Sequence, residues 1–211
     1  MRRPLHCFGK SNTGFIPIMQ GSIRSRWTSL RKRTYGRRPL RGVERGRITE
    51  IGGCMVHTLI ASTPRGNKFF YNINAKVGAR AVNRGIDVQL VQFGYFAMLR
   101  SPKNVGTLSV AERDAFSNIN LGMPCDGTEM DPLVRSIRAH QASRGGTQDG
   151  LVTELKPGHI SYSDATGLHT LMLVALNNSM RDLMEGRYPR IDLHDSCPAD
   201  LKKFVTELFT A

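Results

Sequence analysis

The sequence predicts an α+β protein with a small antiparallel β-sheet or barrel over about residues 47–100, a helical region over about 108–210 and an extended basic N-terminal arm. Polar and apolar residues alternate in the first part of the body, whereas apolar residues recur at three- and four-residue steps in the second. The arm is identified by charge: 13 of the 30 Lys and Arg residues lie in the first 47 positions, with one acid, Glu44. Residues 48–211 carry 17 basic and 16 acidic side chains and are therefore close to neutral.

The strand predictions come from alternation and turn composition. Residues 47–51 alternate polar and apolar side chains, and 54–60 continue with branched and apolar residues. Residues 64–67 have the composition of a turn, and 68–73 again alternate. The apolar stretch 86–99 indicates a further long strand or a bent pair of strands. Together these segments predict three to five antiparallel strands.

Two short helices and a strand are expected next. Ser109 and Glu112 have the spacing of a capping box, which predicts a helix from 109 to about 119. A second helix is expected from residue 131 or 132 to 142, and a strand over 151–155.

The clearest helical periodicity follows, and it predicts the core helix of the body. Its apolar residues are Leu168, Leu171, Met172, Ala175, Leu176, Met180, Leu183 and Met184. Gly186 is suited to end this helix because glycine adopts positive φ without steric cost. A last helix is expected over 198–209, with Pro198 in its first turn. We therefore expect a single body over 48–211, β-rich over 48–105 and mainly helical over 106–211.

The basic arm has two halves. Residues 1–23 begin with arginines, contain no acid and are rich in Ser and Thr, which is typical of an organelle import sequence and predicts a mitochondrial matrix location. A cleaved import sequence over the entire arm is the alternative. Residues 24–47 hold ten basic side chains, more than import requires.

The second half of the arm predicts RNA binding. Guanidinium groups bind phosphate oxygens bidentately, and aromatic rings stack on unpaired bases. The candidate RNA-binding residues are Arg24, Arg26, Trp27, Arg31, Lys32, Arg33, Tyr35, Arg37, Arg38, Arg41, Arg45 and Arg47.

The sequence contains no specific catalytic motif, so we expect no enzyme activity, no cofactor and no small-molecule substrate. Cys54 and His57, with His194 and Cys197, would suit zinc by type. On a strand, however, Cys54 and His57 would point to opposite faces, so we expect no metal site. We interpret the polar residues around His194 as a loop that caps the last helix.

These observations predict a non-enzymatic structural protein, most consistent with a mitochondrial ribosomal subunit whose arm contacts rRNA and whose body docks on neighbouring proteins. No apolar run approaches the about 20 residues of a membrane-spanning helix. Two alternatives remain open: an accessory subunit of a mitochondrial respiratory or ATP-synthase complex, and a viral coat protein with a genome-binding arm.

Overall fold

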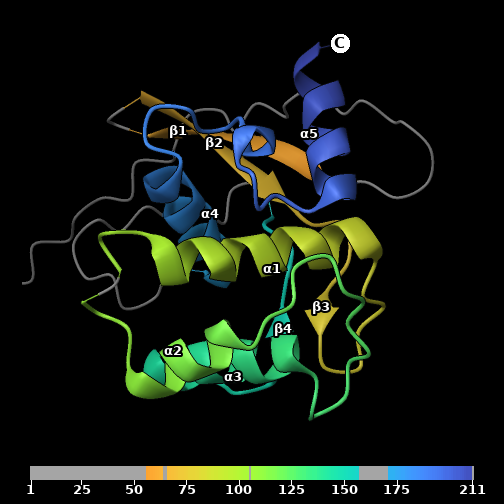
Figure 1. Ribbon diagram of the computed structural model, residues 1–211, viewed down its shortest axis with the longest axis vertical. Coiled ribbons are helices and arrows are strands. Elements are labelled where there is room, and N and C mark those ends of the chain that lie inside the picture. The colour runs from red at the N-terminus through yellow and green to blue at the C-terminus, as the bar shows by residue number, and fades with distance from the viewer. Residues whose placement is uncertain (1–55, 64–65, 105, 157–170, 211) are drawn as a thin grey trace, which may run out of the picture. The chain divides into compact units, whose positions relative to one another are not determined.

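The computed structural model describes residues 56–63, 66–104, 106–156 and 171–210 (Figure 1). These residues form helices and short antiparallel strands, which confirms the α+β class. In chain order the elements are β1 (His57–Thr63), β2 (Gly66–Asn72), β3 (Val77–Gly78), α1 (Gly85–Arg100), α2 (Val110–Ser117), α3 (Pro132–Ser143), β4 (Leu151–Val152), α4 (Met172–Leu183), the 3₁₀ helix η1 (Ile191–Leu193) and α5 (Ala199–Thr210).

The prediction of strands over 86–99 is wrong, because these residues belong to helix α1. The helix is buried on nearly all sides, including its polar residues Gln89 and Gln92. A helix with no solvent-facing stripe lacks the 3.6-residue polar periodicity, so its sequence resembles that of a buried strand. In the described part of 47–100 the predicted antiparallel sheet is therefore limited to the β1–β2 pair, because residues 85–100 add a helix rather than further strands.

The strands form two separate pairs. β1 and β2 are antiparallel, with His57 opposite Asn72 and Thr63 opposite Gly66. β3 pairs antiparallel with β4, which joins parts of the chain more than 70 residues apart. β4 is shorter than the predicted strand over 151–155, and the strand predicted over 47–51 lies outside the described residues.

The other helix predictions are confirmed where the structure describes them. Helix α2 begins at the predicted capping box: Glu112 N donates to Ser109 Oγ at 3.2 Å, and Ser109 N donates to Glu112 Oε2 at 2.9 Å. Helix α3 begins after Asp131, whose carboxylate accepts from Leu133 N at 2.7 Å. Helices α4 and α5 follow the predicted periodicity, and Leu176 of α4 is fully buried.

Helix α1 lies at the centre of the core and packs against α2, α4 and α5 (Figure 1). Gly94 permits the close approach of α1 to α4, because a Cβ atom there would lie 2.8 Å from Leu176 Cβ. The core therefore joins the α2–α3 helices on one side of α1 to the β1–β2 pair, α4 and α5 on the other.

Candidate functional site

The twelve residues predicted to bind RNA, all between 24 and 47, lie outside the described residues. The functional groups that the structure does place belong to the body. They form an open charged pocket, several buried polar networks, and isolated buried thiols and histidines.

A pocket of about 500 Å³ opens beside the β3–β4 pair. It is lined by five charged side chains, which we call the charged pocket: Lys76, Arg80, Glu129, Arg138 and Asp149. These residues come from the β2–β3 turn, the loop after β3, the segment before α3, α3 itself and the segment before β4. The β3–β4 pairing brings them together, because Gly78 lies opposite Leu151.

Two glycines let the backbone segments meet beside this pocket. Gly78 has φ of +122°, and a Cβ atom there would lie 2.0 Å from Gly150 O, which excludes every other residue. Gly150 packs so closely that a Cβ atom would lie 3.0 Å from Arg138 Nε. This close approach allows Gly150 O to accept a hydrogen bond from Ala79 N at 2.9 Å. The wall of the pocket is therefore built from tightly packed backbone.

The loop after β3 holds Arg80 in an unusual conformation. Arg80 has φ of +53° and Asn83 has φ of +50°. The Asn83 side chain fixes the loop: its Oδ1 accepts from Gly78 N at 2.7 Å, and its Nδ2 donates to Gly78 O at 3.0 Å. Left-handed backbone is common for Asn but not for Arg. Such strain persists only where the surroundings determine it, and it is concentrated at functional sites.

The charges of the pocket are only partly balanced. Arg138 forms a bidentate ion pair with Glu129, with Nη2 2.8 Å from Oε1 and Nη1 bonded to Oε2. Asp149 Oδ1 accepts from Gln141 Nε2 at 2.6 Å and from Leu151 N at 3.0 Å. Lys76 and Arg80 are exposed and make no ion pair with any residue that the structure describes. The pocket therefore presents two unpaired cations next to a carboxylate.

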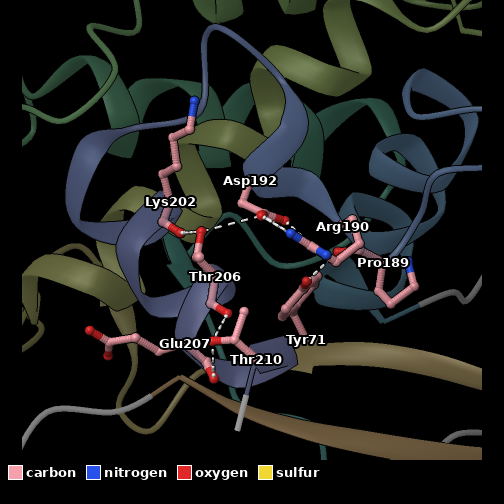
Figure 2. A network of polar contacts seen from close by, with 8 residues as sticks. All are labelled: Tyr71, Pro189, Arg190, Asp192, Lys202, Thr206, Glu207 and Thr210. Atoms are coloured by element: carbon pink, nitrogen blue, oxygen red, sulfur yellow. Dashed lines mark hydrogen bonds and ion pairs between the residues drawn. The ribbon is translucent and has the colours of Figure 1, made fainter.

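A second polar group joins β2 to the C-terminal segments (Figure 2). The Tyr71 hydroxyl donates to Pro189 O. Arg190 Nη2 lies 2.6 Å from Asp192 Oδ2, and the Thr206 hydroxyl of α5 lies 3.2 Å from the same oxygen. Burial raises the pKa of Tyr71 above its usual range, whereas hydrogen bonding to Arg190 holds the pKa of Asp192 below its usual range. This network therefore contains a neutral phenol and an ion pair, and it fastens η1 and α5 to β2.

His57 belongs to a third polar group. Asn72 Oδ1 accepts from Leu155 N at 2.7 Å and from Ile73 N at 3.0 Å, which orients its amide. Asn72 Nδ2 therefore donates to His57 Nε2 at 2.7 Å, and His57 Nδ1 donates to Asn74 Oδ1 at 2.7 Å. Both ring nitrogens are thus used in hydrogen bonds. Cys54, its partner in the zinc set considered from the sequence, lies outside the described residues.

The buried thiols and His140 are neutral at pH 7. Burial raises the pKa of Cys125 and of Cys197 to about 12, so both are protonated. Burial lowers the pKa of His140 to about 4, assisted by Arg144. The His194 ring packs near Phe93, with ring centroids 5.6 Å apart. These groups act as packing residues in the body.

The sequence indicated none of the charged pocket. Its charged residues are spread over more than 70 positions, and the β3–β4 pairing, the left-handed glycines and the Asn83 turn bring them together. Asx-type turns and glycines are visible in a sequence, but the pairing of β3 with β4 is not.

Comparison with protein-family models, curated proteins and solved structures finds no match for this chain. Within the described ranges, no group of three or more His, Cys, Asp or Glu side chains is arranged to hold a metal ion. In those same ranges no helix has the length and apolar character needed to cross a membrane.

Proposed function

We propose that the protein is a non-enzymatic, RNA-associated structural protein whose segment 24–47 contacts RNA and whose body packs against neighbouring proteins. The observation that carries this proposal is the segregation of charge. Ten basic residues and one acid lie within 24–47, whereas residues 48–211 are nearly neutral. A chain segment of this charge density is attracted to a polyanion, and the release of counterions from phosphates supplies the binding free energy.

The composition of the segment favours RNA as that polyanion. Nine of its ten basic residues are arginine, which forms bidentate contacts with phosphate. Trp27 and Tyr35 lie among these arginines and supply rings for stacking on unpaired bases. Stacking on splayed bases is a feature of RNA recognition rather than of duplex DNA recognition.

The chemistry of the body is compatible with a scaffold. The thiols of Cys125 and Cys197 are buried and protonated, and burial also keeps Tyr71 neutral. Several large apolar side chains are nevertheless exposed, including Val82 and Met130, each at 76%. Methionine is enriched in protein–protein interfaces, so these side chains suit contacts with neighbouring subunits.

The finer form of the proposal is a mitochondrial ribosomal subunit. Residues 1–23 have the arginines, the Ser and Thr content and the lack of acids of an import sequence. An organellar ribosome is an assembly that combines import, RNA contact and protein contact in one subunit.

The test is co-sedimentation of the intact protein from its source, with and without nuclease, together with mass spectrometry of its N-terminus. We expect a large, nuclease-sensitive particle and a chain that retains residues 24–47. A mature chain that begins after Arg47, or a particle sensitive to detergent rather than nuclease, would contradict the proposal. The second result would favour a respiratory or ATP-synthase complex, and self-assembly into shells would favour a coat protein.

A variant with Arg31, Lys32, Arg33, Arg37 and Arg38 changed to Ala, the five-alanine variant, locates the contact. We expect it to leave the particle.

Its matched control removes five exposed cations of the body. These are Arg113, Arg135, Lys156, Lys202 and Lys203. We expect this control to remain in the particle, and equal release of both variants would show that the segment is not the contact.

A further inference from the structure

We propose that the charged pocket binds a phosphate monoester carried on a small hydroxylated molecule, of the sugar phosphate or mononucleotide class. This inference concerns the body alone and goes beyond RNA contact by the basic segment. It starts from the volume of about 500 Å³, which lies in the range of about 300–1,000 Å³ found for small-molecule sites.

The charges of the pocket select the anionic group. Arg138 is neutralised by Glu129, which leaves Lys76 and Arg80 as the unpaired cations. A phosphate monoester carries about −1.5 to −2 charges at pH 7 and so matches both cations. A carboxylate would leave one of them unpaired. Arg80 supplies a planar fork of donors and Lys76 a mobile ammonium group, a pair of cations suited to phosphate oxygens.

Asp149 favours a hydroxyl group on the molecule that carries the phosphate. One of its oxygens, Oδ1, is held by Gln141 Nε2 and Leu151 N. The other, Oδ2, has no hydrogen-bond partner among the residues that the structure places. A carboxylate oxygen accepts hydrogen bonds and cannot donate them, so it suits a hydroxyl group of the ligand. The same carboxylate repels a second phosphate placed beside it, which favours a small monoester over an RNA strand.

The backbone around the pocket is held by the protein's own contacts. Asn83 ties the loop to both backbone polar groups of Gly78, and Arg80 has a left-handed backbone conformation within this loop. Arg138 is fixed between Glu129 and the backbone at Gly150. A loop backbone that is already fixed reduces the entropic cost of binding to that of ordering the Lys76 and Arg80 side chains.

The experiment is calorimetric titration of the full chain with ribose 5-phosphate, inorganic phosphate, ribose and adenosine monophosphate. The five-alanine variant serves as the background, because the ten basic residues of the segment 24–47 would also attract phosphate. We expect ribose 5-phosphate to bind with one-to-one stoichiometry, more tightly than either inorganic phosphate or ribose. If adenosine monophosphate binds more tightly than ribose 5-phosphate, the natural ligand is of the mononucleotide class. If the two bind equally, it is of the sugar phosphate class.

Variants of the two cations test the site. Lys76→Met and Arg80→Asn should each weaken binding of ribose 5-phosphate by about tenfold or more, because each removes a charge-assisted contact. Asparagine is chosen at Arg80 because it tolerates the left-handed backbone. Arg113→Gln removes an exposed charge from α2, outside the pocket, and is expected to leave the affinity unchanged. Melting temperatures of all three variants confirm that they are folded.

Asp149→Asn tests the hydroxyl contact. The variant should bind inorganic phosphate more tightly than the unchanged protein does. The ratio of the affinity for ribose 5-phosphate to the affinity for inorganic phosphate should therefore become smaller. A dissociation constant for ribose 5-phosphate above about 10 mM would overturn the proposal. So would a loss of affinity in Arg113→Gln equal to that in the Lys76 and Arg80 variants. An unchanged ratio of the affinities for ribose 5-phosphate and inorganic phosphate in Asp149→Asn would overturn it as well. The five-alanine variant should lose RNA association but keep binding at the charged pocket, so the failure of one proposal is distinguishable from the failure of the other.

Discussion

The side-chain amide of Asn177 occupies the place of a neighbouring strand beside Tyr71. Its Oδ1 accepts from Tyr71 N at 2.7 Å, and its Nδ2 donates to Tyr71 O at 2.9 Å. Asn177 is fully buried on α4, and it also bonds the Tyr188 hydroxyl at 2.8 Å. The free edge of β2 at Tyr71 is thereby satisfied by a helix, which joins α4, β2 and the segment before η1.

Asn177→Asp should destabilise the protein by about 2–4 kcal/mol. The carboxylate keeps the shape of the amide but loses the donor to Tyr71 O and places a charge in the core. Asn178→Asp is the control on the same helix, since Asn178 Oδ1 accepts from Arg181 Nη1 at 2.6 Å and a carboxylate would still do so. Urea unfolding measures the free energy of unfolding of both variants. An equal loss of stability in Asn177→Asp and Asn178→Asp would show that the Asn177 contact with Tyr71 does not stabilise the fold.

Gly94→Ala should cost about 1–3 kcal/mol, because its Cβ would overlap Leu176 where α1 crosses α4. Gly85→Ala is the control in the first turn of the same helix, where a Cβ meets no atom within 4 Å. It should stabilise the helix by about 0.5–1 kcal/mol. Thermal unfolding distinguishes these outcomes, and a stabilising Gly94→Ala would refute the close crossing.

Stability should fall between about pH 6.5 and pH 4 because of His140. Burial lowers its pKa to about 4 in the folded protein, whereas its ordinary value is 6.5. In this window the unfolded chain binds more protons, so acidification favours unfolding by about 3 kcal/mol at most. Above pH 6.5 the histidine is neutral in both states and contributes nothing.

His140→Phe should flatten this pH dependence, because phenylalanine does not titrate. The fold should accept this ring, since His140 packs against Tyr95 and Phe116 and its Nδ1 has no hydrogen-bond partner among the described residues. The free energy of unfolding should be measured from pH 5 to pH 8, which avoids the titration of Glu112. Burial raises the pKa of Glu112, but hydrogen bonds from Ser143 and Ser109 lower it by more, so this pKa lies below its usual range. An unchanged pH profile in the variant would assign the effect to another group.

RNA binding should weaken steeply with salt if the basic segment makes the contact. With about eight phosphate contacts at about 0.7 each, the slope of log K against log salt is about −6. The five-alanine variant should reduce this slope by about 3.5 and leave the melting temperature unchanged. Filter binding at several salt concentrations measures the slope, and a loss of stability in the variant would contradict an independent arm.

Local signals accounted for the elements that the sequence predicted correctly. The capping box of Ser109 and Glu112 is complete within one turn, so it needs no tertiary context. Helices α3 and α5 have one buried stripe each, led by Leu133 and Leu201, and therefore a readable period. Helix α1 has no such period because it is buried on nearly all sides, so its local sequence pattern does not distinguish a helix from a strand.

The α+β class, four of the five described α-helices and the segregation of positive charge before residue 48 followed from the sequence alone, since composition and short-range periodicity are properties of the chain. The helical state of 85–100, the Asn177–Tyr71 contact and the charged pocket became visible in the three-dimensional structure. The pocket depends on long-range pairing of β3 with β4, which brings Lys76 and Asp149 to one opening. Contacts between segments so distant in the chain depend on how the whole core packs, and no local pattern encodes them.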